Sequence, residues 1–162
     1  MNFERDIFLQ MDDADLSAVC RISFSKGSGP GGQKRNKTSS LAKVELPELD
    51  LSASDCTERS QFRNRANALH KLRMQIAFKY RQSRTMPPDN PDCSVKSPNY
   101  PLFAAQLLDI LDSAGFDHRA AAEIYGITPS ALIKKIFRDP DLWQAVQKQR
   151  AAREMHPLLP PK

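Results

Sequence analysis

Alternating hydrophobic and polar positions predict strands in the first part of the chain. Apolar side chains recur at every second residue within 16–24, as they do in a half-buried strand. The alternation returns over residues 41–46, and a third short strand is expected over 49–53, after a turn at Pro47. Between the first two strands, residues 25–40 carry no apolar side chain longer than that of proline. The pattern therefore predicts a small sheet with a long polar loop between its first two strands.

A period of three to four residues follows and predicts one helix of about five turns. Its apolar stripe is formed by Phe62, Ala66, Leu69, Leu72 or Arg73, Ile76 and Tyr80. Two helix starts are open: a capping box of Asp55 and Glu58, or an N-cap at Ser60. A small sheet packed on one long helix belongs to the α+β fold class.

Helical periods also dominate the last third of the chain. Four helices are expected there: three over residues 102–114, 118–125 and 129–137, and a last one that runs through Trp143 to Arg153. The third has Thr128 as its N-cap and Pro129 as its first residue, and the last starts at Asp139 or Asp141. The second and third helices, joined at Gly126, resemble a helix-turn-helix. We therefore expect a small all-helical C-terminal domain.

Prolines mark the division between these two parts. Five of the twelve prolines lie between Pro87 and Pro101, in a stretch with little periodicity and many turn-forming residues. We interpret this stretch as a linker at residues 86–101. It separates a first domain at 1–85 from a second domain at 102–156, and a tail at 157–162 is expected to fray.

Composition excludes several classes of protein. The chain is 40% hydrophobic and 27% charged, which is typical of a folded globular protein. No apolar run approaches the roughly 18 residues of a membrane helix, and the first residues are acidic where a secretory signal is basic. Cys20, Cys56 and Cys93 are widely spaced and form no CxxC, which argues against a disulfide scaffold and a zinc site. We expect a cytoplasmic protein without cofactor, metal or membrane contact.

The surplus of positive charge lies in one block. The chain carries a net charge of +5, yet residues 21–84 carry +9, residues 1–20 carry −4 and residues 85–162 carry zero. From Arg59 to Arg84 there are eight basic residues and no acidic one. Such a block points to a polyanionic partner, most often a nucleic acid. A solvated helix face is the alternative, and charge alone does not separate the two.

Glycines gather in the polar loop. Four of the six glycines lie between Gly27 and Gly32, which suggests unusual backbone angles or close approach to a large partner. Gly27 and Gly32 have the separation of a Walker A phosphate loop, but that motif needs a lysine where Gln33 stands, and Lys34 comes one residue late. A plain glycine-rich linker would not explain the polar run 33–38 or its place between two strands.

Two separated motifs match a known family instead. The first is the run GPGGQ at 29–33, followed by Asn36-Lys37-Thr38, and the second combines Arg59-Ser60-Gln61 with Asn64-Arg65 and Ala68-Leu69. In this order and spacing they resemble the catalytic domain of class I peptide chain release factors and their short ribosome-rescue relatives. The resemblance covers residues 14–84, about half of the chain. It implies that the polar loop is a protruding GGQ loop and that the helix after the sheet is its basic support.

The resemblance also implies a reaction. The loop would enter the peptidyl transferase centre of the large ribosomal subunit and promote attack of water on the ester of peptidyl-tRNA. Gly31, Gly32 and Gln33 are the implied catalytic residues: the glycines provide backbone shape, and the Gln33 N–H donates to the developing oxyanion. Gln33 is also a candidate for N5-methylation by a glutamine methyltransferase.

Contacts to ribosomal RNA are assigned to the loop and to the basic helix. The candidate residues are Lys34, Arg35, Asn36, Lys37, Arg63, Arg65 and Lys71. Arg35 departs from the family, whose members often carry a small or apolar residue at that position. The departure concerns the contacts of the loop with RNA rather than the chemistry.

The subtype follows from what accompanies the two motifs. Fewer than about 20 residues precede the first strand, and no tripeptide codon reader is found. We therefore expect a monomer that releases peptides without reading a codon, on stalled ribosomes or on large subunits that still hold peptidyl-tRNA. The best-known short rescue factors have a basic tail, whereas the C-terminal part of this chain is neutral.

A non-catalytic RNA- or DNA-binding adaptor that keeps the same fold is the alternative. It is supported by the unusual Arg35 and by the helix-turn-helix-like segment. In that segment, contact with a nucleic acid or with the ribosome is assigned to Ser130, Lys134, Lys135 and Arg138. Loss of peptide release in a loop variant would separate the catalytic hypothesis from this one.

Overall fold

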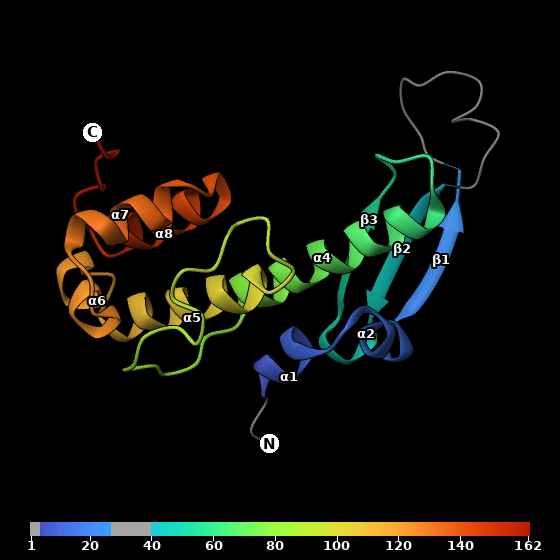
Figure 1. Cartoon of the computed structure of the whole chain (residues 1–162), viewed down its shortest axis with the longest axis horizontal. Helices are drawn as coiled ribbons and strands as arrows, with labels where there is room; N and C mark the ends of the chain where they lie inside the picture. Colours follow the sequence, from blue (N-terminus) through green and yellow to red (C-terminus); the bar gives the residue numbers. More distant parts are fainter. Residues whose placement is uncertain (1–3, 27–39) are drawn as a thin grey trace. The chain divides into compact units, whose positions relative to one another are not determined.

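The computed structural model describes residues 4–26 and 40–162 (Figure 1). The chain divides into two compact units, Met1–Ile76 and Ala77–Lys162. The division falls inside the long helix α4 (Gln61–Lys79), whereas the sequence pattern placed the end of the first domain at residue 85. The domain limits drawn from the sequence stay a prediction.

The first unit is built around an antiparallel sheet. In the part of the chain that the structure describes, this sheet has the strands β1 (Arg21–Ser25), β2 (Leu41–Leu46) and β3 (Leu51–Asp55), in that order. A 3₁₀ turn at Pro47–Leu49 joins β2 to β3, and it ends at Asp50 in the left-handed region with φ 52°. The predicted strand over 41–46 is confirmed, and the third strand lies two residues further on than expected.

The residues before β1 form helices, so the predicted strand over 16–24 is wrong in its first half. Helix α1 covers Arg5–Gln10 and helix α2 covers Asp13–Val19. The Asp12 side chain caps α2 by accepting a hydrogen bond from the Asp15 backbone N–H at 2.8 Å, which favours a helical start. Leu16 is fully buried while Ala18 and Val19 are exposed, so the alternating apolar positions do not share one buried face as they would in a half-buried strand.

Helix α4 runs along β3 and covers the buried face of the sheet (Figure 1). Val44 of β2 and Ala53 of β3 lie opposite each other on that face and are buried, as are Leu69 and Leu72 of the helix. Three hydrogen bonds accompany this packing, because Asn67, Lys71 and Gln75 donate to oxygens of residues 55, 54 and 52 in turn. The helix thus follows the strand from one end to the other, as the α+β fold class requires.

The start of α4 decides between the two predicted caps. The Ser60 hydroxyl accepts a hydrogen bond from the Arg63 backbone N–H at 3.3 Å, and Gln61 is the first helical residue. Ser60 is therefore the N-cap. The predicted stripe is wrong at its first position, because Phe62 is 69% exposed and Asn64 is buried in its place.

The second unit is helical, as predicted. It contains α5 (Tyr100–Ser113), α6 (His118–Tyr125), α7 (Pro129–Phe137) and α8 (Pro140–Ala152). Asp117, Thr128 and Asp139 cap the last three helices, each side chain accepting from a backbone N–H. Gly126 ends α6 with φ 86°, a conformation that disfavours side chains with a Cβ, so the turn between α6 and α7 calls for glycine.

The segment between α4 and α5 has no helix or strand over residues 86–99, yet it is attached to the second unit. The Asp89 backbone N–H donates to the Gln106 side chain at 2.9 Å, and Cys93 is 2% exposed. Near the C-terminus of the chain, the Gln147 side chain donates a hydrogen bond to the Leu158 carbonyl oxygen and accepts one from the Leu158 N–H. The Leu158 side chain is buried. The expectation that the tail frays is therefore wrong at this residue. No helix in the described part of the chain has the length and apolar character needed to cross a membrane.

Candidate functional site

The predicted catalytic residues lie in the stretch that connects β1 to β2. Gly31, Gly32 and Gln33 fall outside the described residues, and so do the four RNA-binding candidates from Lys34 to Lys37. The structure does describe the residues on either side of 27–39, a stretch that we call the GGQ connection. Strand pairing continues up to Ser25 and Leu41, which lie opposite each other. The GGQ connection therefore links the paired ends of two neighbouring strands.

A buried amide binds Ser40, the residue that follows the GGQ connection. Asn64 is fully buried in α4, and its Nδ2 donates to the backbone oxygen of Ser40 at 2.6 Å. The same Nδ2 donates to the Glu58 oxygen at 2.9 Å, and Asn64 Oδ1 accepts from the Glu58 N–H at 2.9 Å. One side chain thus ties the residue after the GGQ connection to the segment that leads into α4. This tie gives a physical reason for asparagine in the second sequence motif.

A second polar cluster joins α4 to the end of β3. The Asp55 carboxylate accepts hydrogen bonds from Lys71 at 2.7 Å, Thr57 Oγ1 at 2.8 Å and Asn67 at 3.1 Å. Burial raises the pKa of Asp55, but the hydrogen bonds from Lys71, Asn67 and Thr57 outweigh burial and hold that pKa at about 2. The sequence pattern named Asp55 only as a helix cap. Its pairing with Lys71 was missed because those residues lie sixteen positions apart.

Some Lys and Arg side chains of the basic block form hydrogen bonds and ion pairs within the protein. Lys71, a predicted RNA-binding residue, lies against Asp55, although its side chain is 51% exposed. Arg73 is buried and donates to the Asp13 carboxylate at 2.8 Å and to the Met11 oxygen at 3.0 Å. These two cations therefore stabilise the first unit in addition to charging it.

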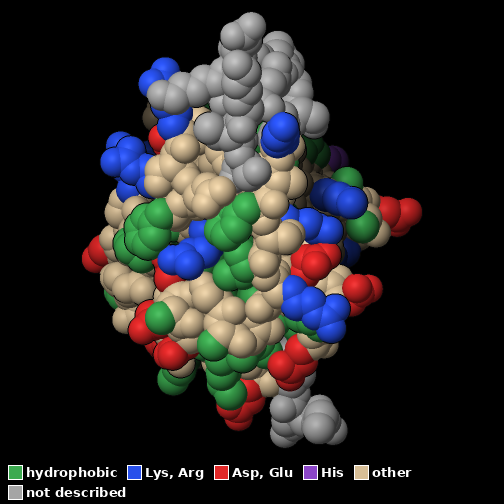
Figure 2. Space-filling view, turned by 90° about the vertical axis from the view of Figure 1, so that its right-hand side faces the viewer, with side chains coloured by type: hydrophobic (Ala, Val, Ile, Leu, Met, Phe, Trp, Pro, Cys, Tyr) green, Lys and Arg blue, Asp and Glu red, His purple; other side chains and the backbone are tan. Residues whose placement is uncertain are grey.

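Arg63 and Arg65 lie at the start of α4, on the solvent side. The Arg63 side chain is 72% exposed, and its guanidinium is 3.9 Å from the Glu58 carboxylate. The Arg65 guanidinium lies 5.3 Å from the ring centre of Phe62. Lys and Arg side chains are spread over the face shown in Figure 2, between hydrophobic and acidic ones, rather than joined in one continuous patch. Both arginines are placed where they can contact an external anion.

The four candidates on α7 have different environments. Lys135 donates to the Pro91 oxygen at 3.0 Å and pairs with Asp92 at 3.3 Å, and Arg138 donates to the Cys93 oxygen at 2.6 Å. Ser130 and Lys134 are exposed instead. Two of the four side chains thus hold the chain's own segment before α5.

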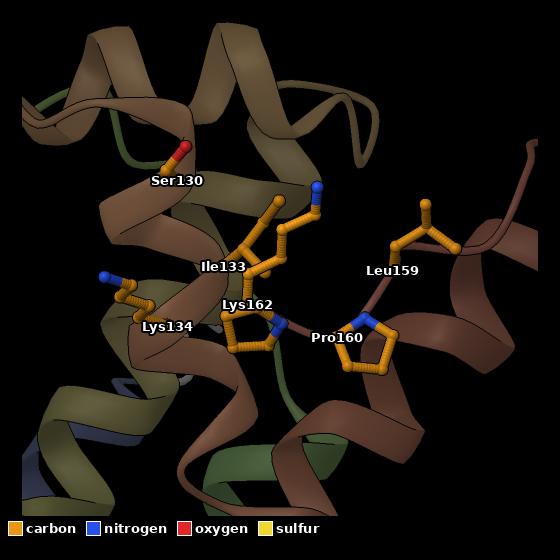
Figure 3. A pocket seen from close by; sticks show the side chains of 7 residues that line it. Ser130, Ile133, Lys134, Leu159, Pro160 and Lys162 are labelled. Atoms are coloured by element: carbon orange, nitrogen blue, oxygen red, sulfur yellow. The ribbon is translucent and has the colours of Figure 1, made fainter.

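Ser130 and Lys134 line a shallow pocket of about 340 Å³ in the second unit (Figure 3). Its other lining residues are Ile133, Leu159, Pro160, Pro161 and Lys162. The pocket is therefore formed between α7 and the end of the chain. Within residues 4–26 and 40–162, no group of three His, Cys, Asp or Glu side chains is arranged to hold a metal ion.

Comparison with known proteins gives a family match. The sequence model described as RF-1 domain matches residues 5–96. Peptide chain release factor 1 of Acidiphilium cryptum is 35% identical over 79 residues, which cover 49% of this chain and 20% of that protein. Peptide chain release factor 2 of Campylobacter hominis is 29% identical over 139 residues, which cover 83% of this chain and 36% of that protein.

A longer alignment is found with peptide chain release factor 1 of Flavobacterium johnsoniae. It is 28% identical over 163 residues, which cover 94% of this chain and 42% of that protein. The chain thus spans between about a fifth and two fifths of the length of these relatives. No solved structure matches it.

Proposed function

The chain belongs to the RF-1 domain family, and from that membership we propose that it hydrolyses peptidyl-tRNA on the ribosome without reading a codon. In this reaction, the oxygen of water attacks the carbonyl carbon of the ester between peptide and tRNA. The bond to the ribose oxygen of the tRNA then breaks, and a proton passes to that oxygen. The products are a free peptide and a deacylated tRNA.

One observation carries the proposal. The GPGGQ run lies inside the family match, in the connection between two strands whose pairing reaches Ser25 and Leu41. Asn64 of the second motif binds the backbone at Ser40. A buried hydrogen bond thus ties the second motif to Ser40, two residues after the first motif ends. This joint supports a loop that is presented by the sheet and braced by α4.

The proposed roles follow the chemistry of ester hydrolysis. Gly31 and Gly32 provide backbone shape, and the Gln33 N–H donates to the oxyanion as it forms. A protein can accelerate such a reaction by positioning water, without a general base of its own. Gln33 is the proposed site of N5-methylation, with a glutamine methyltransferase as partner.

The proposed partners are peptidyl-tRNA and the RNA of the large ribosomal subunit. Lys34, Arg35, Asn36 and Lys37 are assigned to RNA contacts beside the reaction, and Arg63 and Arg65 to contacts made by α4. Lys71 keeps its assignment, but with an ammonium group shared with Asp55 we expect it to contribute less. The protein is proposed to act as a monomer in the cytoplasm.

Single-turnover release of labelled peptide tests the proposal. The substrates are ribosomes on a truncated message, ribosomes with a sense codon or a stop codon in the A site, isolated large subunits, and free peptidyl-tRNA. We expect release from the truncated complex or the large subunit, independent of a stop codon, and none from free peptidyl-tRNA. Release only with a stop codon would contradict codon independence.

The variant Gly32→Ala is expected to abolish release and to leave ribosome binding intact, because a Cβ would obstruct the catalytic backbone. Gly27→Ala, in the same connection but outside the motif, is the matched control and is expected to release peptide. Wild-type rates in Gly32→Ala would remove the catalytic role of the motif.

The non-catalytic adaptor is the second candidate. Its specific support is the pair α6 and α7, which are joined by a tight turn at Gly126. Lys135 and Arg138, however, are engaged by the segment before α5, which leaves Ser130 and Lys134 for an external partner. Binding to ribosomes without release from any substrate would favour this candidate over the hydrolase.

A further inference from the structure

The aromatic side chain of Phe62, at the start of α4, is exposed to solvent. Phe62 is 69% exposed, whereas Leu69 and Leu72 of the same helix are fully buried. A single exposed hydrophobic side chain is ordinary on a protein surface and has no meaning by itself. Phe62 differs because its ring has a charged neighbour: the Arg65 guanidinium lies 5.3 Å from the ring centre, within the range of a cation–π contact.

The backbone that carries the ring is held by its neighbours on the helix. Ser60 caps the first turn through the Arg63 N–H, and Asn64 is buried and bound to the backbone at Ser40 and Glu58. Phe62 lies between these two anchors. The ring is therefore carried by a backbone turn with hydrogen bonds on both sides, two residues from the Asn64 amide that binds Ser40.

The charge around the ring selects the class of partner. Arg59, Arg63 and Arg65 lie within three positions of Phe62, and Glu58 is the nearest acidic residue in the sequence. Arg63 is 3.9 Å from Glu58, a loose pair that leaves most of the side chain in solvent. An apolar protein surface would cover the ring but would offer no anion to the neighbouring guanidinium groups. A nucleotide offers a flat base to the ring and a phosphate to the arginines.

We infer that Phe62 and Arg65 form a stacking platform for an unpaired base of ribosomal RNA, with Arg63 at its phosphate. The inference rests on the proposed function for the source of the RNA, but not on hydrolysis. Stacking on an aromatic ring tolerates any base, because every base has a π face. The platform thus adds a contact to RNA that does not depend on charge alone.

Binding of the full-length protein to vacant large ribosomal subunits tests the platform. Phe62→Leu keeps an apolar side chain but removes the ring, and Phe62→Tyr keeps the ring. We expect Phe62→Leu to weaken binding about tenfold, as for the loss of one stacked base, and Phe62→Tyr to bind within about twofold of wild type. Phe24→Leu, on β1 and 41% exposed, is the matched control and is expected to bind as wild type.

Chemical probing of unpaired bases on the same subunits gives the second readout. We expect at least one base that wild type and Phe62→Tyr protect, and that Phe62→Leu leaves reactive. Equal affinity of Phe62→Leu and wild type would overturn the platform, and so would equal losses in Phe62→Leu and Phe62→Tyr. A tenfold loss in Phe62→Leu without any change in base protection would mean that the ring contacts a ribosomal protein, which also overturns it.

These results are separable from the fate of the proposed function. Vacant subunits carry no ester, so hydrolysis plays no part in this binding. If Gly32→Ala releases peptide normally while Phe62→Leu binds tenfold more weakly, the catalytic proposal fails and the platform stands. If wild type releases peptide and Phe62→Leu binds as wild type, the platform alone fails.

Discussion

The side-chain amide of Asn64 is surrounded by backbone groups rather than by water. The side chain is fully buried, its Nδ2 donates to the oxygens of Ser40 and Glu58, and its Oδ1 accepts from the Glu58 N–H. A buried polar group that loses its hydrogen-bond partner lowers the free energy of unfolding. Removing the Asn64 amide would therefore leave the backbone groups at Ser40 and Glu58 without that partner. The amide therefore acts as a joint between the end of the GGQ connection and the start of α4.

Asn64→Ala is expected to lower the free energy of unfolding by about 2 to 3 kcal/mol, because buried oxygens and an N–H lose their partner. Urea unfolding followed by circular dichroism measures the change. Asn99→Ala is the control, since Asn99 is exposed and its side chain makes no capping hydrogen bond. Similar losses in the two variants would contradict the role of the Asn64 amide.

Asp55 is the second residue whose environment can be tested. Its pKa is held at about 2, below the ordinary value of 3.8, because the hydrogen bonds to the carboxylate outweigh the effect of burial. A group whose pKa is lower in the folded state stabilises the fold above its unfolded pKa. That stability is lost as the pH falls from about 4 toward 2.

Asp55→Asn is expected to remove this pH dependence. Between pH 5 and pH 2, wild type is expected to lose about 2 kcal/mol more unfolding free energy than the variant. Urea unfolding at closely spaced pH values measures both curves. Asp50→Asn, an exposed change of the same kind, is expected to follow wild type. Parallel curves for wild type and Asp55→Asn would show that the carboxylate is not stabilised in the folded state.

At the scale of an element, α7 and its C-cap Arg138 hold another segment of the chain. Lys135 and Arg138 hold the carbonyls of Pro91 and Cys93, and the Arg138 guanidinium also lies 5.3 Å from the ring centre of Phe103. Tyr125 of α6 donates to the same Pro91 carbonyl. The segment before α5, which the sequence pattern predicts to be a linker, is thus fastened to the helices. Ser130 and Lys134 remain on the exposed side.

Arg138→Met is expected to expose Cys93, because the variant keeps an apolar side chain but cannot donate to the Cys93 oxygen. The rate at which a thiol reagent labels Cys93, located by mass spectrometry, is expected to rise at least about fivefold, since a hydrogen bond from a charged group contributes about 1.5 kcal/mol or more. Lys134→Met removes the same charge from the exposed side of α7 and is expected to leave labelling unchanged. Equal labelling in all three proteins would contradict the fastening.

At the scale of the whole molecule, the charge is unevenly distributed along the chain. Residues 21–84 carry a net charge of +9, and residues 85–162 carry none. Counterion release from RNA makes binding by cations dependent on salt, with a slope that grows with the number of phosphates contacted. We therefore expect the first unit to determine the salt dependence of ribosome binding.

Arg63→Gln combined with Arg65→Gln is expected to reduce the slope of log Kd against log salt by up to about 2, one for each phosphate that an arginine no longer neutralises. Affinity for large subunits across a salt series measures the slope. Arg119→Gln combined with Lys148→Gln removes two charges from the second unit and is expected to keep the wild-type slope. If both double variants keep that slope, the contribution of α4 to RNA binding is disproved.

Local patterns in the sequence predicted most of the elements correctly. The helices over 118–125 and 129–137 and the strand over 41–46 have the predicted limits, because periodicity and capping residues act over a few neighbouring positions. Residues 16–19 were misassigned for the same reason. A period of two over so short a stretch does not separate a strand from a helix, and the Asp12 cap decided for the helix.

The sequence by itself determined the family, most of the elements from β2 onward and the place of the basic block, because motifs, periodicity and charge are properties of the chain alone. Only the tertiary structure decided which polar side chains are buried and which Lys and Arg side chains bind acidic or carbonyl groups of the protein itself. Arg73 pairs with Asp13 sixty positions away, Asn64 binds Ser40, and Phe62 stays outside the core. These outcomes depend on distances between residues that are remote in the chain, so they arise only when the helix packs on the sheet.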